Sequence, residues 1–151
     1  MAKSLGPILG ILGIIVGACG LGVGIMMLVN TPKYWYDQVD VTYPSSLTRQ
    51  ALTGLSISAS IGAGEVIYVS FTCTLRLDGS ICEFYIYIDN HVTDAYSSQT
   101  RFDNSGYYYY SIAMQYINNT LSAGVHTITV WALGNDAGNV VYNCVLFAQT
   151  V

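Results

Sequence analysis

The chain has 151 residues, of which 52% are hydrophobic and only 9% are charged, and its formal net charge is −4. Its five Lys and Arg residues are too few for the basic patch that phosphate binding requires, so nucleic acid is not an expected partner. The high apolar content argues against a disordered chain. An ordinary cytosolic enzyme is not expected from such a composition.

Residues 1–31 are predicted to form a hydrophobic α-helix that spans a membrane. Lys3 and Lys33 bracket a stretch without charged residues. Its apolar core of about 25 residues gives a helix of roughly 37 Å, which exceeds the hydrocarbon thickness of about 30 Å. The segment also has features of a cleaved secretory signal, and Val16-Gly17-Ala18-Cys19 resembles a lipoprotein signal. Because the apolar run continues to Val29, we favour a retained helix over cleavage.

The glycines of this segment indicate helix-to-helix packing. They include three pairs spaced four residues apart, which is the spacing that lets two helix backbones approach closely. We therefore expect the helix to pack against copies of itself. The paired residues are Gly6 and Gly10, Gly13 and Gly17, and Gly20 and Gly24.

Residues 32–51 are expected to be a linker that carries aromatic residues at the membrane interface. Pro32 ends the predicted helix, and Lys33-Tyr34-Trp35-Tyr36 supplies the residue types that favour that interface. After Pro44-Ser45-Ser46 the apolar pattern changes to a period of two, which is typical of strands.

Residues 52–151 are predicted to form one antiparallel two-sheet β-sandwich, either a jelly roll or an immunoglobulin-like fold. Short strands separated by turn signals, without helical stretches between them, favour this class. The chain is therefore mainly β, preceded by the N-terminal helix. The expected strands are Val39–Tyr43, Leu52–Ile61, Glu65–Leu77, a strand through Cys82–Ile88, Tyr107–Tyr116, Val125–Leu133 and Val140–Thr150.

A β-hairpin is predicted around Asp78-Gly79, a dipeptide that favours two-residue turns. On both flanking strands apolar residues alternate with polar ones, so each strand is expected to have one buried face and one solvated face. The predicted cross-strand pairs are Leu77 with Ser80, Leu75 with Cys82, and Cys73 with Phe84.

The cysteines leave two alternatives open. In the predicted hairpin Cys73 and Cys82 are diagonal neighbours about 7 to 8 Å apart, too distant for a relaxed disulfide. Cys144 is able to bond either Cys73 or Cys82 across the sandwich if it faces inward. The other interpretation is that these thiols are buried and free. No CxxC pair is present, so a zinc site is not expected.

No catalytic or cofactor motif is found. The histidines are His91 and His126, and neither lies in a known catalytic pattern; a P-loop and a nucleophile elbow are also missing. The acidic loop residues lack the spacing of a calcium loop. We expect a non-enzymatic protein without metal or cofactor.

Five tyrosines are candidate interface or receptor-contact residues. Period-two alternation places them on outward strand faces, where a rigid ring with a hydroxyl tip suits subunit packing or recognition of a glycan or protein. They are Tyr68, Tyr85, Tyr87, Tyr107 and Tyr109. Separately, Asn118-Asn119-Thr120 is an N-glycosylation sequon, so Asn118 is a candidate glycan acceptor on an exterior surface.

Two short stretches carry a resemblance to known families. Phe84–Asp89 and Leu121–Val130, followed by an apolar final strand, resemble the jelly-roll heads of viral fibre and spike proteins. The layout of a glycine-rich helix before a Tyr/Ser/Thr-rich β-head is similar to membrane-associated capsid and spike proteins of archaeal viruses. It is also similar to archaeal type IV pilins, although Lys3-Ser4-Leu5-Gly6 is not a convincing pilin processing site and Pro32 ends the helix early.

These resemblances imply a structural protein outside the cell. The first implies a virion subunit anchored in the envelope, with copies of itself, the lipid membrane and other virion or surface proteins as partners. The pilin resemblance implies a surface filament whose core is made of helices. A membrane-anchored adhesin that binds glycans through the outward tyrosines is a further alternative.

Overall fold

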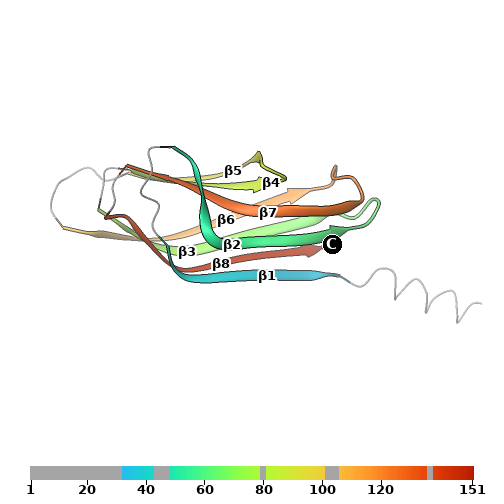
Figure 1. Ribbon diagram of the computed structural model, residues 1–151, viewed down its shortest axis with the longest axis horizontal. Coiled ribbons are helices and arrows are strands. Elements are labelled where there is room, and N and C mark those ends of the chain that lie inside the picture. Colours follow the sequence, from blue (N-terminus) through green and yellow to red (C-terminus); the bar gives the residue numbers. More distant parts are fainter. Residues whose placement is uncertain (1–31, 43–47, 79–80, 101–105, 136–137) are drawn as a thin grey trace, which may run out of the picture. The chain divides into compact units, whose positions relative to one another are not determined.

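The computed structural model describes residues 32–42, 48–78, 81–100, 106–135 and 138–151. The glycine-rich segment, and with it every predicted helix-packing residue, lies outside these ranges. Within the described ranges, no helical segment has the length and hydropathy needed to span a bilayer. The strands in Figure 1 are β1 (Tyr34–Thr42), β2 (Gln50–Ile61), β3 (Ile67–Leu77), β4 (Ile81–Ile88), β5 (His91–Thr100), β6 (Tyr108–Asn118), β7 (Gly124–Gly134) and β8 (Val140–Thr150).

The strands form two antiparallel four-stranded sheets that pack face to face (Figure 1). One sheet has the order β1-β8-β3-β6 and the other β2-β7-β4-β5. Only β4 and β5 are both consecutive in the chain and paired in one sheet; every other connection between described strands passes from one sheet to the other. Eight strands in this order make a jelly roll, not an immunoglobulin-like sandwich. The prediction of a two-sheet antiparallel sandwich is confirmed.

The predicted Asp78-Gly79 hairpin is wrong. Strand β3 pairs with β6 and β8, whereas β4 pairs with β5 and β7 in the opposite sheet. The buried side chain of Asn139 holds the two sides of this crossover. It accepts a hydrogen bond from the Asp78 amide (2.9 Å) and donates one to the Ile81 carbonyl (3.4 Å). Alternation determines which face of a strand is buried, but it does not determine which strand is the partner.

The core confirms the predicted faces. The two strands of the supposed hairpin turn their apolar sides toward each other from opposite sheets, and the rings of Phe71 and Phe84 meet with their centroids 5.9 Å apart. Both rings are fully buried. The buried sets are Ile67, Val69, Phe71, Cys73, Leu75 and Leu77 on β3, and Cys82, Phe84, Ile86 and Ile88 on β4.

Two strands differ from the sequence prediction. The strand predicted at Val39–Tyr43 begins five residues earlier in the structure, within the expected linker: β1 (Tyr34–Thr42) runs along the edge of one sheet. Strand β5 was not predicted, because His91–Thr100 is polar and lacks regular alternation. It is an edge strand, so it needs hydrogen bonds on one side only and buries little. The tight hairpin of the fold is the β4–β5 turn, where Asp89 and Asn90 have φ angles of 50° and 64°, as a type I′ turn requires.

The cysteines Cys73, Cys82 and Cys144 are buried and free in this structure. Cys73 and Cys82 lie in opposite sheets, so they are not the diagonal neighbours that the hairpin predicted. Cys144 does face inward. It lies on β8, next to Cys73 on the adjacent strand β3, and the two thiols are hydrogen-bonded. This bond, together with burial, raises the pKa of Cys73. Burial, with a contribution from Glu83, raises the pKa of Cys82 to about 12.

Candidate functional site

The five candidate tyrosines do not form one surface. Tyr85 and Tyr87 belong to the outer side of the β2-β7-β4-β5 sheet, whereas Tyr68 and Tyr109 belong to the other sheet and Tyr107 immediately precedes its strand β6. Tyr68 lies opposite Ile117 and Tyr109 lies opposite Arg76, at the two ends of the β3–β6 ladder. Tyr107 and Tyr109 are exposed, and the Tyr107 ring lies under the Arg76 guanidinium at 4.5 Å.

Tyr85 and Tyr87 are part of a larger aromatic cluster, which we define as Tyr85, Tyr87, Tyr96 and Trp131. Trp131 on β7 and Tyr96 on β5 lie directly opposite Tyr85 of β4, one on each side. The rings of Tyr87 and Trp131 stack with centroids 4.6 Å apart, and those of Tyr85 and Tyr96 are 5.3 Å apart. No local sequence pattern indicates Tyr96 or Trp131 as members of this cluster, because their proximity to Tyr85 and Tyr87 depends on the pairing of β4 with β5 and β7.

Arg49, the residue immediately before β2, lies against the aromatic cluster. Its guanidinium carbon lies 3.8 Å from the centroid of the Tyr85 ring, which is cation–π geometry. Hydrogen bonds to Tyr87 and Tyr85 raise the pKa of Arg49. Tyr85 is buried beneath these neighbours, and its hydroxyl donates to the Glu83 carboxylate. The predicted outward face is correct for Tyr85, but its ring is covered.

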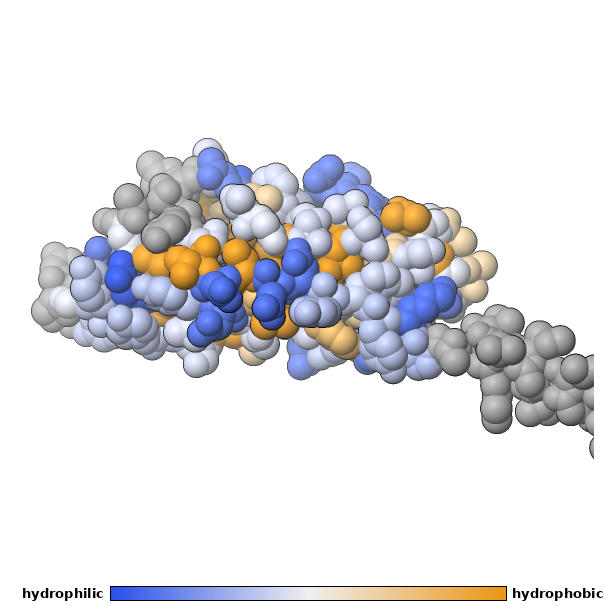
Figure 2. Space-filling view, turned by 60° about the horizontal axis from the view of Figure 1, so that its bottom comes forward, coloured by the Kyte–Doolittle hydropathy of each residue, from blue (hydrophilic) through white to orange (hydrophobic). Residues whose placement is uncertain are grey.

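The opposite sheet presents an uncharged face on its outer side. Twelve outward positions form three rows of four across the sheet, and none carries a charged side chain. All twelve are exposed or half-buried. Figure 2, which brings the lower side of Figure 1 forward, shows exposed hydrophobic residues in orange between pale surface of intermediate hydropathy and separate blue hydrophilic patches. The rows are Tyr34, Gln149, Tyr68 and Ile117; Tyr36, Phe147, Ser70 and Gln115; and Gln38, Val145, Thr72 and Ala113.

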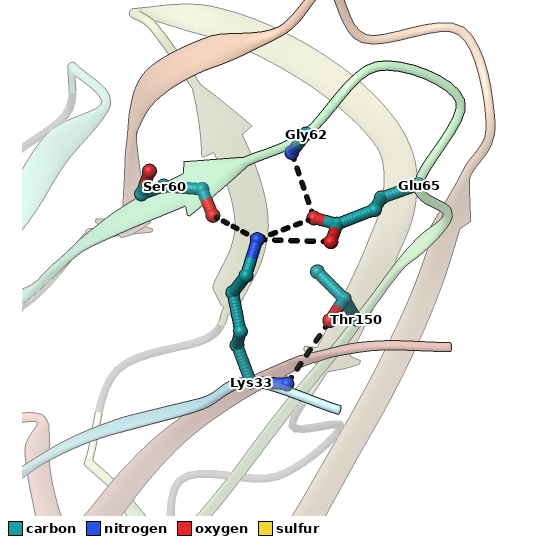
Figure 3. Close-up of polar contacts among 5 residues, drawn as sticks. All are labelled: Lys33, Ser60, Gly62, Glu65 and Thr150. Carbon is teal, nitrogen blue, oxygen red and sulfur yellow. Dashed lines mark hydrogen bonds and ion pairs between the residues drawn. The ribbon is translucent and has the colours of Figure 1, made fainter. Parts of the chain in front are cut away.

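A polar clamp fixes the first residues of the β-sandwich (Figure 3). The Lys33 ammonium lies 2.9 Å from both carboxylate oxygens of Glu65, which also accepts a hydrogen bond from the Gly62 amide at 2.7 Å. The Lys33 amide donates to the Thr150 hydroxyl at 3.0 Å, and the Lys33 carbonyl accepts from the Thr150 amide. The Gly62 hydrogen bond and the Lys33 charge lower the pKa of Glu65.

A second polar group, at the β4–β5 turn, joins His126 to Asp89. The ring nitrogens of His126 lie 2.6 Å from an Asp89 carboxylate oxygen and 2.8 Å from the Ser122 carbonyl. Both partners only accept hydrogen bonds, so a ring that satisfies both must donate twice and is protonated. The bonds to Asp89 and Ser122 raise the pKa of His126, and those from Thr127 and His126 lower the pKa of Asp89.

A cavity lies beside this turn. Beside Asp89 lies a cavity of about 180 Å³ that His91, Tyr116, Asn118 and Leu121 also line. Across the described ranges, no group of three or more His, Cys, Asp or Glu residues is arranged to hold a metal ion. The Asn118 carboxamide oxygen accepts from the Thr120 amide at 2.7 Å and hydroxyl at 3.0 Å, and its modification remains a prediction.

Comparison with known proteins adds information on the fold. No protein-family profile matches the sequence. No curated protein is significantly similar to it. Among solved structures, one from infectious bursal disease virus strain Gx is similar with a TM-score of 0.50 and 13% identity, over 80% of this chain and 32% of the viral chain. The chain thus spans about a third of the viral chain, and this likeness supports the sandwich architecture.

Two further solved structures are similar at lower TM-scores. The infectious bursal disease virus VP2 subviral particle has a TM-score of 0.47 and 13% identity, over 80% of this chain and 33% of the other. The C-terminal domain of EclA, described as a sugar-binding protein, has a TM-score of 0.40 and 8% identity, over 77% of this chain and 78% of the other.

Proposed function

We propose that this protein is a non-enzymatic structural subunit of an extracellular assembly, namely an envelope-anchored capsid or spike subunit of a virion. In this proposal residues 1–31 are a membrane helix that packs against copies of itself through its spaced glycines. The jelly roll is the head exposed on the virion surface. Copies of the chain, membrane lipid and other virion or surface proteins are its partners.

The observation that carries the proposal is the uncharged face. In a two-fold contact between identical subunits the same patch lies on both sides, so a charge on or near the symmetry axis would face its own copy at close range. The chain has a net charge of −4, yet three complete rows of this sheet carry none of its charged residues. Such a face allows identical copies to associate without burying unpaired charges.

The fold agrees with this role without determining it. Jelly rolls include viral capsid domains and lectin domains, and one architecture serves many unrelated functions. The uncharged face and the predicted glycine packing narrow the choice toward assembly. A pilin-like filament is the alternative that shares self-association and differs in having a lipid-free helical core.

The experiment is a sedimentation measurement on the full chain in detergent, with one variant on each side of the sandwich. Wild type is expected to sediment as an oligomer, and Tyr36→Lys in the middle row of the uncharged face is expected to shift it toward smaller species. The control is Tyr96→Lys on the opposite sheet, since Tyr36 and Tyr96 are both exposed, at 69% and 54%. A monomeric wild type, or equal effects of both substitutions, would contradict the proposal.

A further inference from the structure

The aromatic cluster is a group of neighbouring rings on the surface of the β-sandwich. It lies on the outer side of the sheet opposite the uncharged face and draws on three adjacent strands. Trp131 is half-buried and Tyr96 is 54% exposed, so both present ring surface to solvent. The stacked pair Tyr87–Trp131, at 4.6 Å, and the tilted pair Tyr85–Tyr96, at 5.3 Å, make these rings neighbours on one face.

The polar ends of Trp131 and Tyr85 are already hydrogen-bonded within the protein. The Trp131 indole nitrogen donates to the Thr129 hydroxyl at 3.0 Å, and the Tyr85 hydroxyl donates to Glu83. These bonds and the ring stacking fix the orientation of the aromatic surface before a ligand arrives. A ligand therefore meets a preorganised surface, which lowers the entropic cost of binding.

Arg49 narrows the class of ligand. Its guanidinium already occupies the position over the Tyr85 ring that a cationic ligand would take. A cationic ligand on the cluster would lie close to the positive charge of Arg49, and the repulsion between the two charges disfavours lysine-rich peptides and quaternary ammonium groups. Glu83, in contact with Tyr85 on the same side of the sheet, disfavours strongly acidic ligands. The charges next to the cluster thus select for a neutral ligand.

We propose that the aromatic cluster, with Arg49 and Glu83, is a carbohydrate-binding site for a neutral pyranose. One side of such a sugar ring is a patch of C–H groups that packs against an aromatic surface, and its rim carries hydroxyl groups. Arg49 supplies donors for these hydroxyls and Glu83 supplies an acceptor. This site is independent of the proposed assembly role, since it uses the other face of the sandwich.

The test is binding of the full chain to an array of neutral hexose, pentose and N-acetylhexosamine oligosaccharides, together with acidic oligosaccharides. The chain is kept in a detergent without a sugar head group, so that the detergent does not compete. We expect binding to neutral glycans, weakened at least about tenfold by Tyr96→Ala and by Arg49→Ala. Tyr109→Ala is the matched control, because Tyr109 is 65% exposed on the opposite sheet, and it is expected to bind like wild type.

A second measurement keeps the proposal testable if a variant fails to fold. Trp131 emission of the unmodified chain is expected to change on titration with the neutral oligosaccharide that binds best, and Trp131→Phe removes that change while Trp35→Phe does not. Absence of neutral-glycan binding, binding of acidic glycans only, or equal losses in Tyr96→Ala and Tyr109→Ala would overturn it. Self-association through this cluster in place of glycan binding would also overturn it, and it would appear in the sedimentation test as an effect of Tyr96→Lys. The other results leave the sedimentation test of assembly unaffected.

Discussion

The imidazole of His126 lies 2.6 Å from the carboxylate of Asp89 and so ties β7 to the β4–β5 turn. His126 is almost fully buried, whereas Asp89 is exposed. Because the second ring nitrogen contacts the Ser122 carbonyl, the protonated form of His126 satisfies both contacts and the neutral form only one. This pair makes the stability of the turn dependent on pH.

The first prediction concerns that dependence. The folded-state pKa of His126 is raised above 6.5, so its stabilisation is complete below pH 6.5 and is lost as pH rises through the raised value. The pKa of Asp89 is lowered below 3.8, so its contribution is present above pH 3.8 and is lost as pH falls through the lowered value. The pair is therefore strongest between these limits.

The measurement is the Tm of the full chain between pH 5.5 and pH 8. Wild type is expected to lose Tm over this range more steeply than His126→Gln. The control is His91→Gln, which changes an exposed histidine next to the same turn. Equal slopes of Tm against pH for wild type and His126→Gln would show that the His126–Asp89 pair does not titrate in this range.

The second prediction concerns the crossover between the sheets. Asn139→Ala removes the acceptor for the Asp78 amide and the donor for the Ile81 carbonyl, so we expect a loss of about 1–3 kcal/mol in the free energy of unfolding. Urea unfolding of the full chain measures this loss. Asn119→Ala, at an exposed position, is expected to change stability by less than about 0.5 kcal/mol. If Asn139→Ala left the free energy of unfolding unchanged, the stability of the crossover would not depend on this side chain.

The third prediction ranks the two partners of the Lys33 clamp. Lys33→Ala removes a partly exposed ion pair and is expected to lower stability by about 0–1 kcal/mol. Glu65→Ala also leaves the Gly62 amide without its side-chain acceptor, so its loss is expected to be larger. Hydrogen exchange at the Gly62 amide is expected to accelerate in Glu65→Ala and much less in Lys33→Ala. The reverse order in stability and exchange would refute this ranking.

The fourth prediction concerns the thiols. In the folded chain Cys73, Cys82 and Cys144 are expected to resist alkylation, because all three are buried. In addition, the contact with Cys144 together with burial raises the pKa of Cys73, and burial raises the pKa of Cys82. If the chain is oxidised during folding, we expect Cys144 to pair with Cys73 of the adjacent strand and Cys82 to remain a thiol. Peptide mapping without reduction distinguishes this pairing, and a Cys82–Cys144 bond would contradict it.

The sequence predicted the faces of the strands better than their partners. Ile67 through Leu77 alternate strictly, and a period of two directly reports which side chains are buried. Partner choice is a long-range property, so Asp78-Gly79 was consistent with both a hairpin and a crossover. In the structure the buried side chain of Asn139, about 60 residues further along the chain, bonds to both sides of this crossover.

The candidate surfaces were predictable only in part for the same reason. Tyr85 and Tyr87 were placed on the outward face from alternation alone, but their neighbours Trp131 and Tyr96 follow from strand order. Strand β5 has a polar sequence without alternation, so the sequence pattern predicts neither this strand nor an outward position for Tyr96. The uncharged face is made by four strands, and their order in the sheet cannot be read from any local sequence pattern.

The central claim is that this chain is a subunit of a lipid-anchored assembly that contacts its own copies. The most direct measurement is a cryo-EM reconstruction of the native particle that contains it. We expect a lipid-containing particle with the β-sandwich on the outside and neighbouring copies in contact through the face that includes Tyr36 and Phe147. Isolated monomers without contacts between copies, or a lipid-free filament with a helical core, would contradict the claim.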